Sequence, residues 1–141
     1  MTIKILLGGL ITGIVTFLLC WLFFGVLLVD YYADNTASYP GLIKKIPEVW
    51  FIAMANFAWG LLLSWIFNKA GIDTVRKGFI AGLIISFLNI AGFDLFMHAQ
   101  MNLYSESLIV VDIAVNTVMG ATGGAVLGWW MGRVRKVSLS T

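Results

Sequence analysis

Long apolar runs, each of the length of a helix, are separated by short polar segments along this chain. The first apolar run extends from Ile5 to Val29 without a charged residue. Three further apolar runs follow, separated by short polar links that contain turn residues. An α-helix needs about 20 apolar residues to cross the hydrocarbon core of a bilayer. The pattern therefore predicts four transmembrane helices, at residues 4–30, 48–68, 77–99 and 107–132.

The composition supports a membrane protein of one domain. Of 141 residues, 60% are hydrophobic and 11% are charged, and the mean hydropathy is +0.95. Soluble domains average about 25% charged residues. We therefore expect an all-α integral membrane protein, a four-transmembrane-helix bundle that forms a single membrane domain over residues 1–141. The net charge of +2 is too small to suggest a nucleic-acid partner, and no cofactor-binding motif is present, so no cofactor is predicted.

The basic residues predict the orientation of the four helices. Basic flanks resist translocation and stay on the cytoplasmic side. Seven basic residues fall on one side of a four-span topology and two on the other. The sequence therefore predicts a plasma-membrane (bacterial inner-membrane) protein with both termini in the cytoplasm. The seven inner residues are Lys4, Lys69, Arg76, Lys77, Arg133, Arg135 and Lys136, and the two outer ones are Lys44 and Lys45.

An offset of 64 residues relates the first half of the chain to the second. At this offset Asp30 falls on Asp94 and Glu48 falls on Asp112. Acidic residues are rare within membrane spans, so these two matches carry more weight than the apolar ones. The alignment predicts two pseudo-repeated helical hairpins, related by an axis along the membrane normal. A chance alignment stays open as the alternative.

Two carboxylates lie inside the predicted spans at similar depth. Asp94 comes about five residues before the outer end of its helix, and Asp112 about five residues after the outer start of the next. Apart from Lys4 and Lys77 at the inner ends of their helices, no lysine or arginine lies within a predicted span, so a proton, a bound cation or hydrogen-bond donors must compensate the charge. The sequence predicts a ligand-binding cluster made of these acids, acids at the helix ends and amides at mid-depth: Asp94, Asp112, Asp30, Glu48, Asn56, Asn89 and Asn116.

The single histidine lies close to this cluster. His98 follows Asp94 by four residues and therefore shares its helix face. Histidine in this position is a candidate metal ligand or proton carrier. A solvated histidine at the water boundary is the alternative.

The leading functional hypothesis is non-enzymatic. Clustered carboxylates in a low-dielectric setting favour the binding or translocation of a cation, a proton or a cationic small molecule from the outer side. One alternative is a structural or accessory subunit of a larger membrane complex or a homo-oligomer, because the glycines of helix 107–132 allow close helix packing. The second alternative is a membrane enzyme in which Asp94 and His98 act on a lipid-like substrate. In each case the lipid bilayer is the first partner.

Overall fold

The computed structural model describes residues 2–42, 44 and 46–138, with side chains along the last helix described as far as residue 135. Within this part of the chain all regular structure is helical, and an isolated antiparallel bridge joins Thr36 to Tyr104. Four of the described helices are long and apolar enough to cross a membrane: Ile3–Leu27, Val49–Ala70, Val75–Gln100 and Glu106–Arg135. Lys45, which we counted on the outer side, lies outside the described residues, as does the side chain of Lys136.

The helical elements follow the predicted order, with one break. The expected first helix, residues 4–30, divides into α1 (Ile3–Leu22), a π-helical turn η1 (Phe23–Leu27) and a short α2 (Val29–Asn35). At Leu28 the backbone leaves helical geometry, with φ −117° and ψ 7°. The other helices are α3 (Val49–Ala70), α4 (Val75–Gln100) and α5 (Glu106–Ser138).

Local caps define the tight turn between α3 and α4. Gly71 adopts the left-handed conformation, with φ +67°, and its N–H donates to the carbonyl of Phe67. This geometry ends a helix, and glycine adopts it without steric penalty. Three residues later Thr74 caps α4, because its hydroxyl accepts from the N–H of Lys77 at 3.3 Å.

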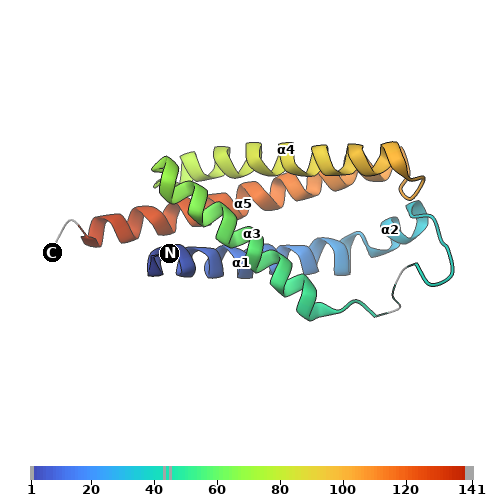
Figure 1. Ribbon diagram of the computed structural model, residues 1–141, viewed down its shortest axis with the longest axis horizontal. Coiled ribbons are helices and arrows are strands. Elements are labelled where there is room, and N and C mark those ends of the chain that lie inside the picture. The colour runs from blue at the N-terminus through green and yellow to red at the C-terminus, as the bar shows by residue number, and fades with distance from the viewer. Residues whose placement is uncertain (1, 43, 45, 139–141) are drawn as a thin grey trace.

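The helices are arranged as two antiparallel pairs. Figure 1 shows α4 and α5 lying side by side, while α3 crosses α1 obliquely. Helix α5 also packs against α1, so it lies at the centre of the assembly. Both termini and the α3–α4 turn lie at one end, which we call the terminal end. The other end, which we call the α2 end, holds α2, the link 36–48 and the link between α4 and α5.

Glycines close each helix pair by direct backbone contact. A Cβ atom on Gly124 of α5 would lie 2.9 Å from the Cα of Gly82 on α4. In the other pair, a Cβ atom on Gly60 of α3 would lie 2.8 Å from the backbone N of Gly13 on α1. Real side chains do not fit at these separations, so the glycine spacing sets how closely the helices approach.

These contacts relate the two pairs by unequal offsets. Gly60 and Gly124 make corresponding contacts and are 64 positions apart in the sequence. Their partners Gly13 and Gly82 are 69 positions apart. The gap-free offset of 64 therefore matches α3 to α5 but does not match α1 to α4 in these contacts. The pseudo-repeat stays a prediction. To match the glycine contacts as well, α1 would have to align with α4 at an offset of 69 residues, five more than the offset that aligns α3 with α5.

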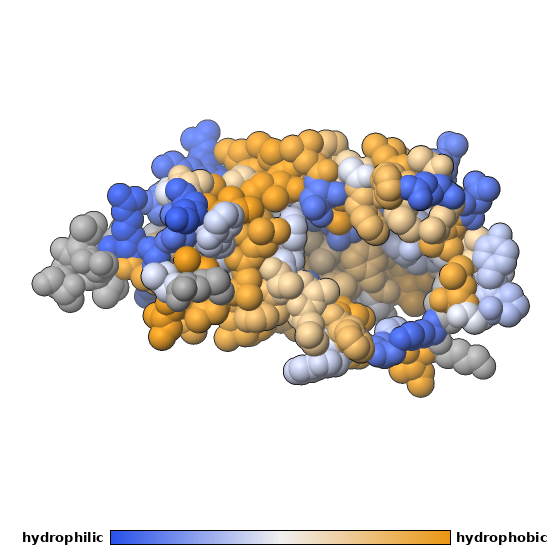
Figure 2. Space-filling model, in the orientation of Figure 1, coloured by the Kyte–Doolittle hydropathy of each residue, from blue (hydrophilic) through white to orange (hydrophobic). Residues whose placement is uncertain are grey.

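The two ends of the molecule differ in packing. Toward the terminal end, Leu63 and Phe67 of α3 form a buried core with Leu127 and Met131 of α5. Toward the α2 end, α3 and α4 diverge, and Figure 2 shows the visible face hollowed there. The candidate site lies in this more open half.

Candidate functional site

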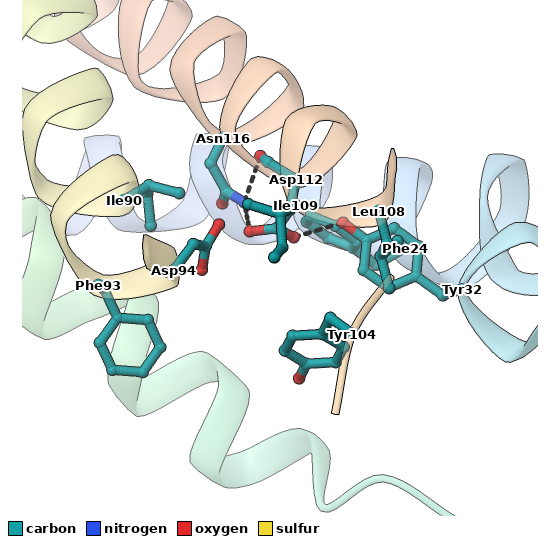
Figure 3. Close-up of a pocket in the computed structure, with 10 residues that line it drawn as sticks. All are labelled: Phe24, Tyr32, Ile90, Phe93, Asp94, Tyr104, Leu108, Ile109, Asp112 and Asn116. Atoms are coloured by element: carbon teal, nitrogen blue, oxygen red, sulfur yellow. Dashed lines mark hydrogen bonds between the residues drawn. The ribbon is translucent and has the colours of Figure 1, made fainter. Parts of the chain in front are cut away.

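The carboxyl groups of Asp94 and Asp112 lie close together in the wall of a cavity (Figure 3). Asp94 lies six residues before the end of α4, and Asp112 lies six residues after the start of α5. At 1.5 Å per residue, each is about 9 Å from the α2 end of its helix. Figure 3 shows both carboxyl groups pointing into a cavity of about 300 Å³. The remaining lining residues are Phe24, Tyr32, Ile90, Phe93, Tyr104, Leu108, Ile109 and Asn116.

Both carboxyl oxygens of Asp112 have hydrogen-bond donors. The hydroxyl of Tyr32 donates to Oδ1. The side-chain amide of Asn116, one turn further along α5, donates to Oδ2 at 2.9 Å and to the backbone carbonyl of Asp112, also at 2.9 Å. Two side chains, one from α2 and one from the next turn of α5, thus hold this carboxylate in one position (Figure 3).

Asp94 lacks such support. Its side chain is buried, with 6% of its surface exposed, and its Oδ2 atom has no hydrogen-bond partner among the described residues. A buried polar atom without a partner costs about 1–3 kcal/mol, and more when it carries charge. No lysine, arginine or histidine is among the residues that line the cavity. A ligand, a proton or water must therefore satisfy this oxygen.

The two tyrosines at the cavity remain neutral donors. Burial raises the pKa of Tyr32 well above its usual range, and its hydrogen bond to Asp112 and the charges of Asp112 and Asp94 raise it further. Burial also raises the pKa of Tyr104, with the same two carboxylates adding to the effect. Since an unperturbed tyrosine has a pKa near 10, both phenols keep their protons at any physiological pH.

A second cavity continues from the first toward the middle of the molecule. It has a volume of about 280 Å³ and shares Ile90 and Asn116 with the first. The amides predicted from sequence meet here, because Asn56 and Asn89 also line it. Ser86 adds a buried hydroxyl that has no hydrogen-bond partner among the described residues. Polar side chains thus extend from the carboxylates to mid-helix.

Two acids of the predicted cluster lie outside both cavities. Asp30 is exposed in the first turn of α2, because the break at Leu28 starts a new helix there. Glu48 is exposed at the start of α3 and forms an ion pair with Lys44. Helix α3 crosses α1 obliquely, and this carries its first turn away from the α4–α5 pair (Figure 1). The structure therefore does not join these two acids to Asp94 and Asp112.

His98 is likewise separate from the cavity. It is exposed one turn beyond Asp94, and no ion pair or side-chain hydrogen bond links the two in the described part of the chain. Among those residues no group of three or more His, Cys, Asp or Glu side chains is placed to hold a metal ion. The prediction that His98 binds a metal therefore finds no support in a cluster of ligands among the described residues.

Aromatic residues of the site were missed by the sequence reasoning. Phe24, Tyr32 and Tyr104 line the first cavity. The rings of Phe24 and Tyr32 meet edge to face, with centroids 5.1 Å apart. Phe24 lies inside the first apolar run and gives no signal in the sequence. Tyr32 and Tyr104 lie just beyond the ends of apolar runs, but interfacial anchors have the same sequence pattern.

The arrangement suits the binding of positive charge. It combines an unpartnered carboxylate oxygen, a second carboxylate held by neutral donors and aromatic walls. Comparison of the chain with protein-family models, curated proteins and solved structures gave no match. The functional argument therefore rests on the geometry of this chain.

Proposed function

We propose that this chain is an integral protein of the plasma membrane that binds a cation from the outer side, with its termini in the cytoplasm. The membrane location is supported by the four apolar helices and by large exposed hydrophobic side chains along them, such as Leu18 and Leu88. Figure 2 shows apolar residues covering much of the middle of the visible face, with hydrophilic residues concentrated toward the two ends. Such a surface is stable in lipid and prone to aggregation in water.

The observation that carries the cation site is the buried oxygen of Asp94. This oxygen faces a cavity, has no hydrogen-bond donor among the described residues, and lies close to a second carboxylate. Like charges at one site disfavour the ionised pair, and a bound positive charge relieves the repulsion. In the empty site a proton serves this purpose. A cation that enters the site then displaces the proton, so binding and proton release are linked.

Binding is favoured over free passage by the closed packing at the terminal end. The buried core formed by Leu63, Phe67, Leu127 and Met131 lies between the two cavities and the terminal end. Glycine contacts between α4 and α5 leave no room between these helices there. Translocation therefore requires the two helix pairs to move relative to one another, whereas binding from the α2 end requires no such movement.

Proton release by the purified protein in detergent tests the proposal. Titration with mono- and divalent inorganic cations and with small organic cations should release protons from the parent protein. The double variant Asp94→Asn/Asp112→Asn should release none, because it has lost both carboxylates of the site. The matched control is Asp30→Asn/Asp34→Asn, which removes two exposed acids from α2 and should behave as the parent.

The results of these titrations distinguish a cation-binding role for Asp94 and Asp112 from a purely structural one. If no cation releases protons, while the double variant is folded and as stable as the parent, the cation site does not exist. A scaffold or accessory role then becomes the preferred hypothesis for the protein. If the control variant loses proton release as well, the acids of α2 belong to the site and its assignment to Asp94 and Asp112 is wrong.

A further inference from the structure

We propose that the cation is an organic ammonium ion, with its charged head in the first cavity, against the carboxyl groups of Asp94 and Asp112 and the rings of Phe24, Tyr32 and Tyr104. This inference rests on the cation site proposed above and names the class of ligand that fits it. Three features carry it: the hydrogen bonds already made by the two carboxylates, the aromatic lining, and the size of the paired cavities.

The carboxylate oxygens do not form a coordination shell for a metal ion. Both oxygens of Asp112 accept hydrogen bonds, from Tyr32 and from Asn116. Only Asp94 offers a buried oxygen without a donor among the described residues. Ca²⁺ takes 6–8 oxygen ligands and Mg²⁺ a near-ideal octahedron. One unpartnered carboxylate oxygen is a poor match for either ion, but it is sufficient as the counter-ion of an ammonium group.

The walls of the first cavity are suited to a cation of low charge density. Ring faces attract ammonium groups that lie within about 6 Å of the ring centroid, and the attraction is strongest for desolvated sites. Phe24 lies in η1 and Tyr32 in α2, whereas Tyr104 comes from the link between α4 and α5. The hydrogen bond from Tyr32 to Asp112 fixes one of these rings beside the carboxylates (Figure 3).

The cavity volumes point to a small organic molecule. The first cavity measures about 300 Å³ and adjoins a second of about 280 Å³ through Ile90 and Asn116. Since water occupies about 30 Å³ per molecule, each cavity has room for roughly ten waters. An inorganic ion leaves most of this space to water. An ammonium head with a short organic substituent fills the first cavity and extends toward the unpartnered hydroxyl of Ser86 in the second.

Competition between ammonium compounds and inorganic ions tests the ligand class. The full-length protein in detergent is titrated with tetramethylammonium and n-butylammonium, and in parallel with Na⁺, K⁺, Mg²⁺ and Ca²⁺. Proton release and the shift in Tm are measured together. We expect the ammonium compounds to release protons and raise Tm at concentrations where the inorganic ions do neither, and we expect Asp94→Asn to abolish both effects.

Ring variants test the aromatic contribution. Tyr104→Leu should raise the apparent Kd for tetramethylammonium about 2- to 30-fold, the range that loss of one cation–π contact implies. Tyr104→Phe keeps the ring and should stay within about threefold of the parent protein. Tyr39→Leu removes an exposed tyrosine outside both cavities and serves as the matched control. If Tyr104→Leu does not fold, Phe24→Leu makes the same test from another segment.

Each result decides between the two proposals. Proton release by an inorganic ion, with none by the ammonium compounds, keeps the cation site and overturns the ammonium inference. Release by neither kind of cation overturns both proposals. Equal affinities of Tyr104→Leu, Phe24→Leu and the Tyr39→Leu control overturn the role of the aromatic walls.

Discussion

At the scale of single residues, the contrast between two carboxylates defines the site. Asp112 has a hydrogen-bond donor for each oxygen, from Tyr32 and Asn116. Asp94 lines the same cavity and is more deeply buried, yet its Oδ2 atom has no donor among the described residues. In the proposed site, Asp112 would provide a fixed negative charge, and the Oδ2 atom of Asp94 would accept from the bound cation. Removing a donor from Asp112 should therefore have a measurable effect on stability.

The variant Tyr32→Phe tests this residue-scale argument. It keeps the ring and its edge-to-face contact with Phe24 but removes the hydroxyl that donates to Asp112. Hydrogen bonds between helices in membranes contribute about 0.6 kcal/mol on average and up to about 1.7, and bonds to charged groups lie at the strong end. We expect a loss of about 1–2 kcal/mol in the free energy of unfolding in detergent. The control Tyr31→Phe should change it by less than about 0.5 kcal/mol, and equal losses in the two variants would contradict the argument.

The sequence pointed to residues of the two cavities where a carboxylate or an amide interrupts an apolar span. Asp94 and Asp112 were identified because ionised side chains within apolar spans are rare and costly. Tyr32 and Tyr104 were not, since a tyrosine beyond the end of a span has the same pattern whether it anchors the chain at the interface or turns inward. Asp30 was included as an acid at the outer end of the first predicted span, but the local backbone break at Leu28 leaves it exposed.

At the scale of elements, the length of the apolar runs predicted where most helices begin and end. Except at the α1 break and the end of α5, the predicted bounds lie within two residues of those in the structure. The run length carries this information because about 20 residues are needed to cross the bilayer core. The helix faces were harder to predict. Lipid and bundle interior are both apolar, so hydrophobicity does not distinguish the buried side of α4 from its lipid-facing side.

Glycine positions supply the information that hydrophobicity lacks. Gly124→Ala should separate α5 from α4, because its Cβ atom would lie 2.9 Å from the Cα of Gly82 and closer still to the carbonyl oxygen of Gly78. Backbone atoms at this contact cannot move as a flexible side chain can. We expect a loss of about 1–3 kcal/mol in the free energy of unfolding, the usual penalty of overpacking.

Gly92→Ala is the matched control for this element-scale prediction. Gly92 lies within α4, and a Cβ atom there would meet nothing within 4 Å. Alanine favours the helical state over glycine by about 0.5–1 kcal/mol. Unfolding of the two variants in a denaturing detergent series makes the comparison. If Gly92→Ala is as destabilising as Gly124→Ala, helix propensity or lipid contact, not the α4–α5 contact, determines the glycine requirement.

At the scale of the whole molecule, packing and polarity divide the protein into two halves. The terminal end is closed by apolar side chains and by an ion pair between Asp73 and Arg135. The α2 end is open and contains the carboxylates. There, the side chain of Ser105 donates to Asn35 at 2.8 Å and joins α2 to the α4–α5 link. The direction in which this polar half faces decides whether the proposed cation would come from the outer or the cytoplasmic solution.

The basic residues predict that the α2 end faces outward, and labelling with a membrane-impermeant thiol reagent tests this orientation. In a Cys20→Ser background, cysteine is introduced at Thr2, on the terminal end, or at Asn102, in the α4–α5 link; both positions are exposed. Cells that express Asn102→Cys should be labelled when intact, whereas Thr2→Cys should be labelled only after the membrane is permeabilised. The excess of lysine and arginine around the terminal end is the physical reason, because such flanks are retained in the cytoplasm. The reverse labelling pattern would place the carboxylates on the cytoplasmic side, and the cation would then be an intracellular one.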